Sequence, residues 1–142
     1  MTPQPLTLYW DSSAIVSAIT PGPDHDEAAG LARRPGTHLM SSLALAEVLA
    51  AIHRLRREGD AATAAVALDE VQRPPWVQMQ ETPDPFVLEQ TAARWPLRGA
   101  DLWHLALAKT LQQEQPSLRL LSFDRRLTEA AAGEGLVAPR FS

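Results

Sequence analysis

Cysteine is absent from this chain of 142 residues. Disulfide bonds and thiolate metal sites are therefore excluded, and the absence suits a reducing compartment such as the cytoplasm. No apolar run reaches the 18 or so residues that a membrane-spanning helix requires. The first ten residues, MTPQPLTLYW, lack the basic region and long apolar core of a signal peptide. We therefore expect a cytoplasmic protein that does not bind membranes.

Lysine is almost as scarce, because Lys109 is the only one among the 13 basic residues. The arginines occur in local clusters such as Arg33–Arg34 and Arg125–Arg126. Guanidinium groups match phosphate better than ammonium groups do, which makes a phosphate-bearing ligand one interpretation. The alternative is a solvated surface whose arginine content reflects genomic base composition. The formal net charge of -4 disfavours a protein that binds nucleic acid through bulk positive charge.

The remaining composition is that of an ordinary globular domain. Hydrophobic residues make up 45% of the chain and charged residues 21%, both near the average for globular proteins. A chain of this length buries one sizeable core. No repeat, low-complexity segment or interdomain linker divides it, so we expect a single domain over residues 1–142.

Strand and helix signals alternate along the chain. Short apolar runs predict strands at 6–10, 38–41, 76–80 and 118–123, with a last short strand at 136–138. Helical periodicity and end signals predict helices at 12–18, 24–34, 42–58, 61–72, 85–94, 101–113 and 125–132. Such alternation is typical of an α/β fold with a mainly parallel sheet.

Four acidic residues lie within or at the end of apolar elements. Asp11 and Asp124 each follow a predicted strand, which places them at the carboxyl edge of a parallel sheet, where α/β proteins bind ligands. Asp101 begins a strongly apolar helix, and Glu47 shares its side of a helix with alanines. Each acid alone has a structural explanation, as a turn former, a helix cap or a surface residue. Together they would repel one another, and all-oxygen ligands suit Mg²⁺ or Mn²⁺, so the four predict a metal site.

The segments that carry these acids resemble the PIN-domain ribonucleases, and among them the VapC-type toxins of bacterial toxin–antitoxin pairs. The segments are YWDSSAIV, SSLALAEVLAAI, LRGADLWHLALA and LLSFDRRL. Each motif is weak alone, and their order over residues 6–137 makes the resemblance specific. It implies a PIN-like three-layer α/β/α sandwich around a mainly parallel sheet. It also carries the catalytic, metal-binding quartet of the family onto four residues. They are Asp11, Glu47, Asp101 and Asp124.

The resemblance implies further residues that bind substrate or orient the quartet. They are Ser12, Arg98, His104, Ser122 and Arg125. For His104, which shares a helix face with Asp101, a structural hydrogen bond is favoured over metal ligation. Arg98 and Arg125 flank the quartet in sequence and are candidates for guiding RNA, although a structural ion pair explains either equally well. Ser12 either orients the neighbouring carboxylate, binds phosphate or caps a helix.

The activity implied by the resemblance is metal-dependent endoribonuclease cleavage, with one or two Mg²⁺ or Mn²⁺ ions as cofactor. A metal lowers the pKa of a bound water and supplies the hydroxide that attacks the phosphodiester. The resemblance further implies an RNA substrate, a cognate antitoxin protein and a homodimer, with 5′-phosphate and 3′-hydroxyl ends as products.

Two other interpretations stay open: a PIN-domain nuclease of RNA processing, and a catalytically inactive PIN-like module that binds protein. The intact quartet disfavours the second. A phosphorylated receiver-type domain is disfavoured because Asp11 has no acidic neighbour. A P-loop nucleotide-binding protein is disfavoured because the chain has no GxxxxGK[ST] motif.

Overall fold

The computed structural model describes residues 5–138, so both ends of the domain predicted over 1–142 lie outside the described residues. The strands are β1 (Leu6–Trp10), β2 (Gly36–Ser41), β3 (Trp76–Met79) and β4 (Arg119–Leu121). The helices are α1 (Ser12–Ile19), α2 (His25–Ala32), α3 (Ser42–Arg57), α4 (Ala61–Val71), α5 (Pro85–Arg94), α6 (Gly99–Glu114) and α7 (Arg125–Gly133). None of these helices has both the length and the apolar character needed to cross a bilayer.

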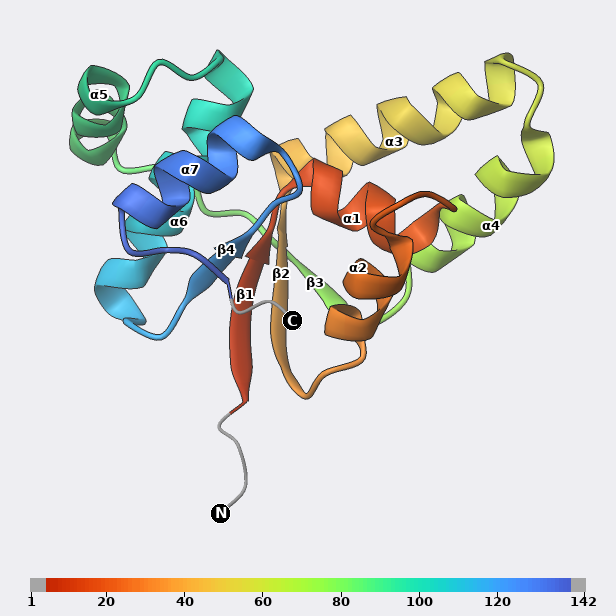
Figure 1. Ribbon diagram of the computed structural model, residues 1–142, viewed down its shortest axis with the longest axis horizontal. Helices are drawn as coiled ribbons and strands as arrows, with labels where there is room; N and C mark the ends of the chain where they lie inside the picture. Colours follow the sequence, from red (N-terminus) through yellow and green to blue (C-terminus); the bar gives the residue numbers. More distant parts are fainter. Residues whose placement is uncertain (1–4, 139–142) are drawn as a thin grey trace.

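The four strands form one parallel sheet in the order β3-β2-β1-β4. At the carboxyl end of the central strand β1, Trp10 pairs with Met40 of β2 on one side and with Leu121 of β4 on the other. Parallel strands need long crossover connections, which the helices supply. The strands β1 and β2 run toward the top of Figure 1, where α1 and α3 begin. Residues that follow the strands are therefore brought to one edge of the sheet.

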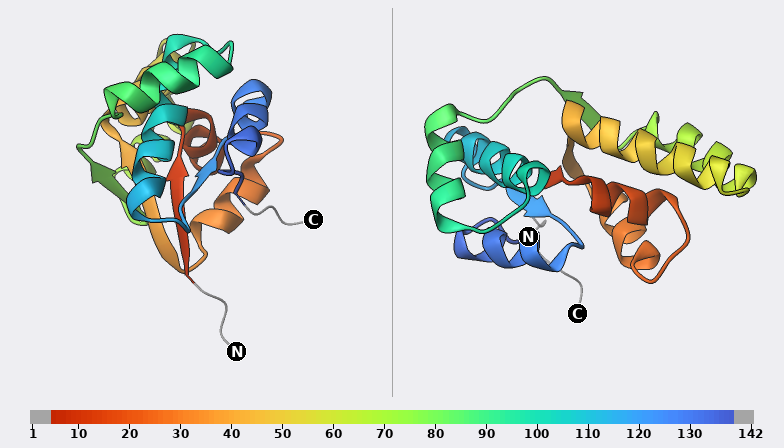
Figure 2. Two further views of the ribbon diagram at one scale, coloured as in Figure 1. Left: turned by 90° about the vertical axis from the view of Figure 1, so that its left-hand side faces the viewer. Right: turned by 90° about the horizontal axis from the view of Figure 1, so that it is seen from above.

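Alternation along β1 divides the core into two layers, because successive side chains of a strand point to opposite faces. Leu8 and Trp10 pack in a cluster with residues of α1, α2, α3 and α4. Tyr9 belongs to a second cluster with residues of α6 and α7. Figure 2 shows from above that the α3–α4 pair extends to one side of the sheet while α5, α6 and α7 gather on the other. The predicted α/β/α sandwich is confirmed.

The predicted strands near the C-terminus are longer than those of the structure. The strand expected at 118–123 covers only Arg119–Leu121, because the next residues turn toward the start of α1. The backbone N–H of Phe123 donates to Ser13 Oγ at 3.0 Å and not to a neighbouring strand. The strand expected at 136–138 is reduced to one isolated bridge between Val137 and Leu120.

Candidate active site

Asp11 lies at the carboxyl end of β1 and is almost fully buried. Its Oδ1 accepts hydrogen bonds from Ser13 Oγ at 2.7 Å and from the backbone N–H of Ala14 at 2.9 Å. Its Oδ2 accepts a hydrogen bond from Ser122 Oγ at 2.6 Å. Burial raises the pKa of Asp11 above its usual value, against these three hydrogen bonds, which lower it. The carboxylate is therefore held in one orientation from both sides.

The hydroxyl groups around Asp11 exclude two of the three roles expected of Ser12, and phosphate binding by Ser12 stays a prediction. Ser13, not Ser12, donates to the carboxylate, and Asp11 itself caps α1. The two-residue spacing from Asp11 to Ser13 is a common pattern for local hydrogen bonds and was the available signal. Ser122 Oγ also accepts a hydrogen bond from the backbone N–H of Asp124 at 3.0 Å. One hydroxyl thus links the segments that carry two of the four acids.

Asp124 and Asp101 begin their helices in different ways. Asp124 caps α7, because its Oδ1 accepts a hydrogen bond from the Leu127 N–H at 2.9 Å. Asp101 does not cap α6, as one interpretation of the sequence proposed; the cap is Arg98, and Asp101 lies in the first turn. A carboxylate in that turn is stabilised by the positive end of the helix dipole. Within residues 5–138, no hydrogen bond or ion pair engages the Asp101 carboxylate.

The electrostatics of Asp101 show that the acids lie close together. Burial raises the pKa of Asp101, and the charge of Asp124 raises it further. The charge of Glu47 acts in the same direction, while His104 and Arg98 lower the pKa without reversing the rise. Like charges raise a carboxyl pKa only at short range. Acids from α3, α6 and the start of α7 are therefore neighbours at this edge of the sheet.

Glu47 is connected to α6 through a chain of buried hydrogen bonds. Its Oε1 lies 2.7 Å from His104 Nε2, and the other ring nitrogen, Nδ1, lies 2.5 Å from Tyr9 Oη. Tyr9 Oη donates to Ser41 Oγ at 3.0 Å, and Ser41 caps α3 through the Ala44 N–H. Burial raises the pKa of the Tyr9 hydroxyl well above its usual value, so it stays protonated. The chain fixes the start of α3 and the side chain of Glu47 relative to α6.

This chain of contacts bears on the role expected of His104 and adds two residues that the sequence did not indicate. The structure gives His104 a hydrogen bond to Glu47, and the preference for that role over metal ligation stays a prediction. Tyr9 and Ser41 were missed by the sequence analysis, because they lie in strands and contact the site through residues distant in sequence. The position of Tyr9, two residues before Asp11 on a strand, was the one available signal.

A hollow of about 410 Å³ opens beside Asp101 and Asp124. Its other lining residues are Leu97, Arg98, Arg125 and Arg126. Arg125 Nε lies 3.1 Å from Glu129 Oε1, and both side chains are exposed. Such a surface pair contributes about 0–1 kcal/mol to stability. The hollow therefore combines acids that can hold a cation with guanidinium groups that can contact a phosphate.

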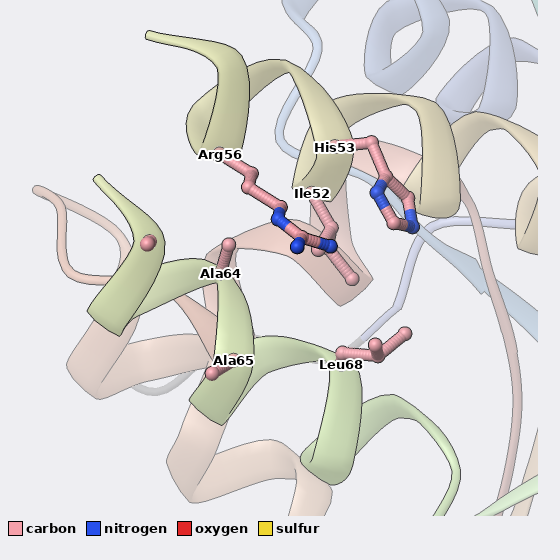
Figure 3. A pocket seen from close by; sticks show the side chains of 7 residues that line it. Ile52, His53, Arg56, Ala64, Ala65 and Leu68 are labelled. Carbon is pink, nitrogen blue, oxygen red and sulfur yellow. The ribbon is translucent and has the colours of Figure 1, made fainter. Parts of the chain in front are cut away.

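A second hollow, of about 330 Å³, lies between α3 and α4 and has a different lining. Its walls are Ile52, His53, Arg56, Ala61, Ala64, Ala65 and Leu68 (Figure 3). Arg56 extends across the opening toward Ile52 and His53 in this view. The lining contains no carboxylate, so this hollow offers no site for a hard cation.

The four acids match a divalent cation in donor chemistry. Carboxylate oxygens are the ligands that Mg²⁺ and Mn²⁺ prefer, and the carboxylate of Asp101 has no hydrogen bond that would compete for them. Among the described residues, no three acidic or histidine side chains form a group placed to enclose a metal ion. The residues therefore fit such an ion in chemistry, with the Asp101 carboxylate free of competing hydrogen bonds, while the ligand positions stay a prediction.

Comparison with known proteins identifies the family. The fold is similar to the crystal structure of VapC20 from Mycobacterium tuberculosis, a sarcin–ricin loop cleaving toxin, with a TM-score of 0.62 and 17% sequence identity. The match covers 94% of this chain and 99% of that one, and at this identity it shows the fold. No curated protein matches the sequence. The model of the PIN domain matches residues 8–133, which include all four acids, and the protein therefore belongs to the PIN-domain family.

Proposed function

We propose that the protein is a metal-dependent endoribonuclease and the toxin of a toxin–antitoxin pair. PIN domains are typically nucleases and generally use divalent metals. The observation that carries the proposal is the group of mutually repelling acids at the sheet edge, where Asp124 and Glu47 raise the pKa of Asp101. Carboxylates with a shifted pKa in a hollow are frequent at catalytic sites. Their charge is offset when a cation binds.

The proposed roles follow from where each acid is held. The acids would hold Mg²⁺ or Mn²⁺, which would supply water activation at neutral pH and positive charge beside the phosphate. Asp101 and Asp124 line the same hollow and would hold one or two such ions there. Asp11 presents its carboxylate from β1, oriented by two serine hydroxyls. Glu47 completes the quartet, and His104 orients it.

An RNA substrate is supported by the arginines beside the acids. Arg98 and Arg125 line the same hollow as Asp101 and Asp124, so a phosphate that binds the arginines also lies beside the acids. The toxin assignment is supported by the likeness to VapC20 over nearly the full length of both chains. The same proposal includes a cognate antitoxin protein that binds the toxin, and a homodimer formed with a second copy of the chain.

The test is cleavage of total RNA by the purified protein with Mg²⁺, with Mn²⁺ or with EDTA. Wild type is compared with Asp101→Asn, which keeps the size of the side chain, and with Asp69→Asn as a matched control on the exposed surface of α4. We expect cleavage that needs metal, is lost in Asp101→Asn and persists in Asp69→Asn. Activity that survives both EDTA and Asp101→Asn would contradict the quartet mechanism.

A catalytically inactive binding module gives a different result. Such a protein would neither cleave RNA nor gain stability from Mn²⁺. Sequencing of the cleaved ends separates a toxin with one target from a general processing nuclease, because the first gives a single cut in one class of RNA.

A further inference from the structure

We infer that single-stranded RNA extends from the acidic edge along a groove between the α5–α6 connection and α7, with Arg126 bound to a backbone phosphate. The inference rests on the proposed function and adds to it a path for the substrate and a residue that binds it. The sequence placed Arg126 in an arginine cluster but not among the candidate site residues.

The groove is built from two adjoining hollows. The first is the hollow beside Asp101 and Asp124, and next to it lies the Trp95 hollow, of about 470 Å³. The Trp95 hollow is lined by Trp95, Pro96, Leu97, Arg126, Glu129 and Ala130. Leu97 and Arg126 line both hollows, so the two adjoin one another and Arg126 lies where they meet. The groove leads from carboxylates to a mainly apolar wall.

The aromatic part of that wall is held rigidly. Trp95 Nε1 donates to Glu134 Oε2 at 2.8 Å, and Arg94 Nη1 donates to the same oxygen at 3.1 Å. The Trp95 ring lies so close to Gly133 that a Cβ at that position would clash with it. An indole fixed in this way loses little conformational freedom when a ligand binds. An apolar and aromatic surface beside a cation suits an unstacked base of single-stranded RNA.

The charges of the groove favour a polyanion once the quartet holds a cation. Arg98 lies on the wall formed by the α5–α6 connection, and Arg126 lies on the α7 wall. Glu129, the acid that lines the Trp95 hollow, forms an ion pair with Arg125. Within residues 5–138 no acidic side chain forms an ion pair with Arg126. Its guanidinium is therefore available for a phosphate.

Arg56 provides a matched control in the same molecule. It is exposed, belongs to a hollow of similar volume and forms no ion pair in the described part of the chain. Its hollow lies between α3 and α4 and is lined by alanines where the groove has carboxylates (Figure 3). Loss of Arg56 and loss of Arg126 change the net charge equally, so only their positions distinguish them.

The experiment measures binding of a fluorescein-labelled RNA decanucleotide of random sequence by fluorescence anisotropy, with Mg²⁺ present. Asp101→Asn is the background for every variant, so that the RNA is not cleaved. We expect Arg126→Gln to raise the Kd about five- to tenfold and to lower the slope of log Kd against log salt by about 0.7, the value for one phosphate contact on a single strand. Arg56→Gln should change neither quantity.

A second probe tests the apolar wall. A decanucleotide of abasic residues keeps the phosphates and lacks the bases, and we expect it to bind about tenfold more weakly than the RNA. Equal binding of the two oligonucleotides would overturn the assignment of a base to the wall formed by Trp95, Pro96 and Leu97. Melting temperatures of the two arginine variants should equal that of the background, since both side chains are exposed.

The outcomes separate this inference from the proposed function. If Arg126→Gln and Arg56→Gln weaken RNA binding equally, or if neither does, the inferred RNA path along the groove is wrong. This holds even if the wild type shows metal-dependent cleavage. Absence of RNA binding also overturns it. If the wild type never cleaves RNA yet binding depends on Arg126 and not on Arg56, the groove is supported and the nuclease proposal fails.

Discussion

Glu134 and Asp101 are acids on the same side of the sheet with opposite surroundings. The side chain of Glu134, at the end of α7, is almost fully buried. Burial acts to raise its pKa, but hydrogen bonds from Trp95 and Arg94, together with the charges of Arg94 and Lys109, outweigh that effect and lower it. For Asp101 burial and neighbouring acids act together, and the pKa is raised.

The difference separates an acid that serves the fold from one that, under the proposed function, serves a ligand. Glu134 is neutralised by groups within the chain, so its charge stabilises the folded state. Asp101 is left beside other acids, which costs stability and persists at sites where function needs it. The chain has the means to neutralise an acid, as Glu134 shows, and within residues 5–138 the Asp101 carboxylate has no hydrogen bond or ion pair.

The largest effect we expect from this comparison is the response to metal. Mn²⁺ at about a hundred times its Kd should raise the free energy of unfolding by about 2.7 kcal/mol, because it binds only the folded state. Urea unfolding with and without Mn²⁺ measures the gain. The double variant Asp101→Asn/Asp124→Asn should lose it, whereas Glu134→Gln should keep it. If Mn²⁺ does not raise the free energy of unfolding of the wild type, the contrast drawn between Asp101 and Glu134 is wrong.

The next effect is the loss of the charge of Glu134. Glu134→Gln should lower the free energy of unfolding by about 2 kcal/mol, because hydrogen bonds to a charged and buried group are among the strong ones. Glu129→Gln is the matched control: its carboxylate is exposed, and the change should stay within about 0.5 kcal/mol. Equal losses in urea unfolding of both variants would show that Glu134 has no special role in the fold.

A smaller effect of opposite sign is expected at the sheet edge. Asp101→Asn should raise the free energy of unfolding of the metal-free protein by about 0.5–1 kcal/mol, because it removes repulsion and loses no hydrogen bond. The same variant should lose cleavage. A variant less stable than the wild type at neutral pH would show that the Asp101 charge stabilises the fold.

The smallest effect we expect is in how pH changes the difference in free energy of unfolding between each variant and the wild type. The lowered pKa of Glu134 means that its contribution is present above its ordinary pKa of about 4.3 and is lost as the pH falls through the lower, folded value. The raised pKa of Asp101 means that its penalty is present at neutral pH and disappears as the pH falls through the raised value. Unfolding of Glu134→Gln and Asp101→Asn against wild type at several pH values measures both. If Asp101→Asn raises the free energy of unfolding by the same amount at every pH, repulsion between Asp101 and its neighbouring acids is not the cause.

The sequence predicted the fold well because its signals are local. The strand at Leu6–Trp10 and the helix at Pro85–Arg94 were predicted with the observed bounds, since turn and cap residues mark their ends. The start of α6 was predicted two residues late. Gly99 and Ala100 carry no apolar periodicity, so the helix was expected to begin at Asp101. That error made Asp101 a candidate cap and concealed that its carboxylate lacks a hydrogen bond.

The acids of the candidate site could be predicted, and most of their partners could not. Asp11 and Asp124 follow apolar strands, and the order of the motifs indicated Glu47 and Asp101. The contact between Glu47 and His104 joins residues 57 positions apart, and that between Tyr9 and His104 spans 95. Such pairs depend on how helices pack across the sheet, which periodicity does not specify. Arg126 was recognised only as part of an arginine cluster, because its place between two hollows follows from the packing of α7.

The placement of β4 beside β1 has a consequence for synthesis of the chain on the ribosome. The N–H of Asp11 donates to the Leu121 carbonyl at 3.1 Å, and the Ser122 hydroxyl that orients Asp11 is made 111 residues after it. A nascent chain therefore holds Asp11 without the strand and the hydroxyl that position it until translation has passed Ser122. The proposed active site therefore stays incomplete until the codon for Ser122 has been translated.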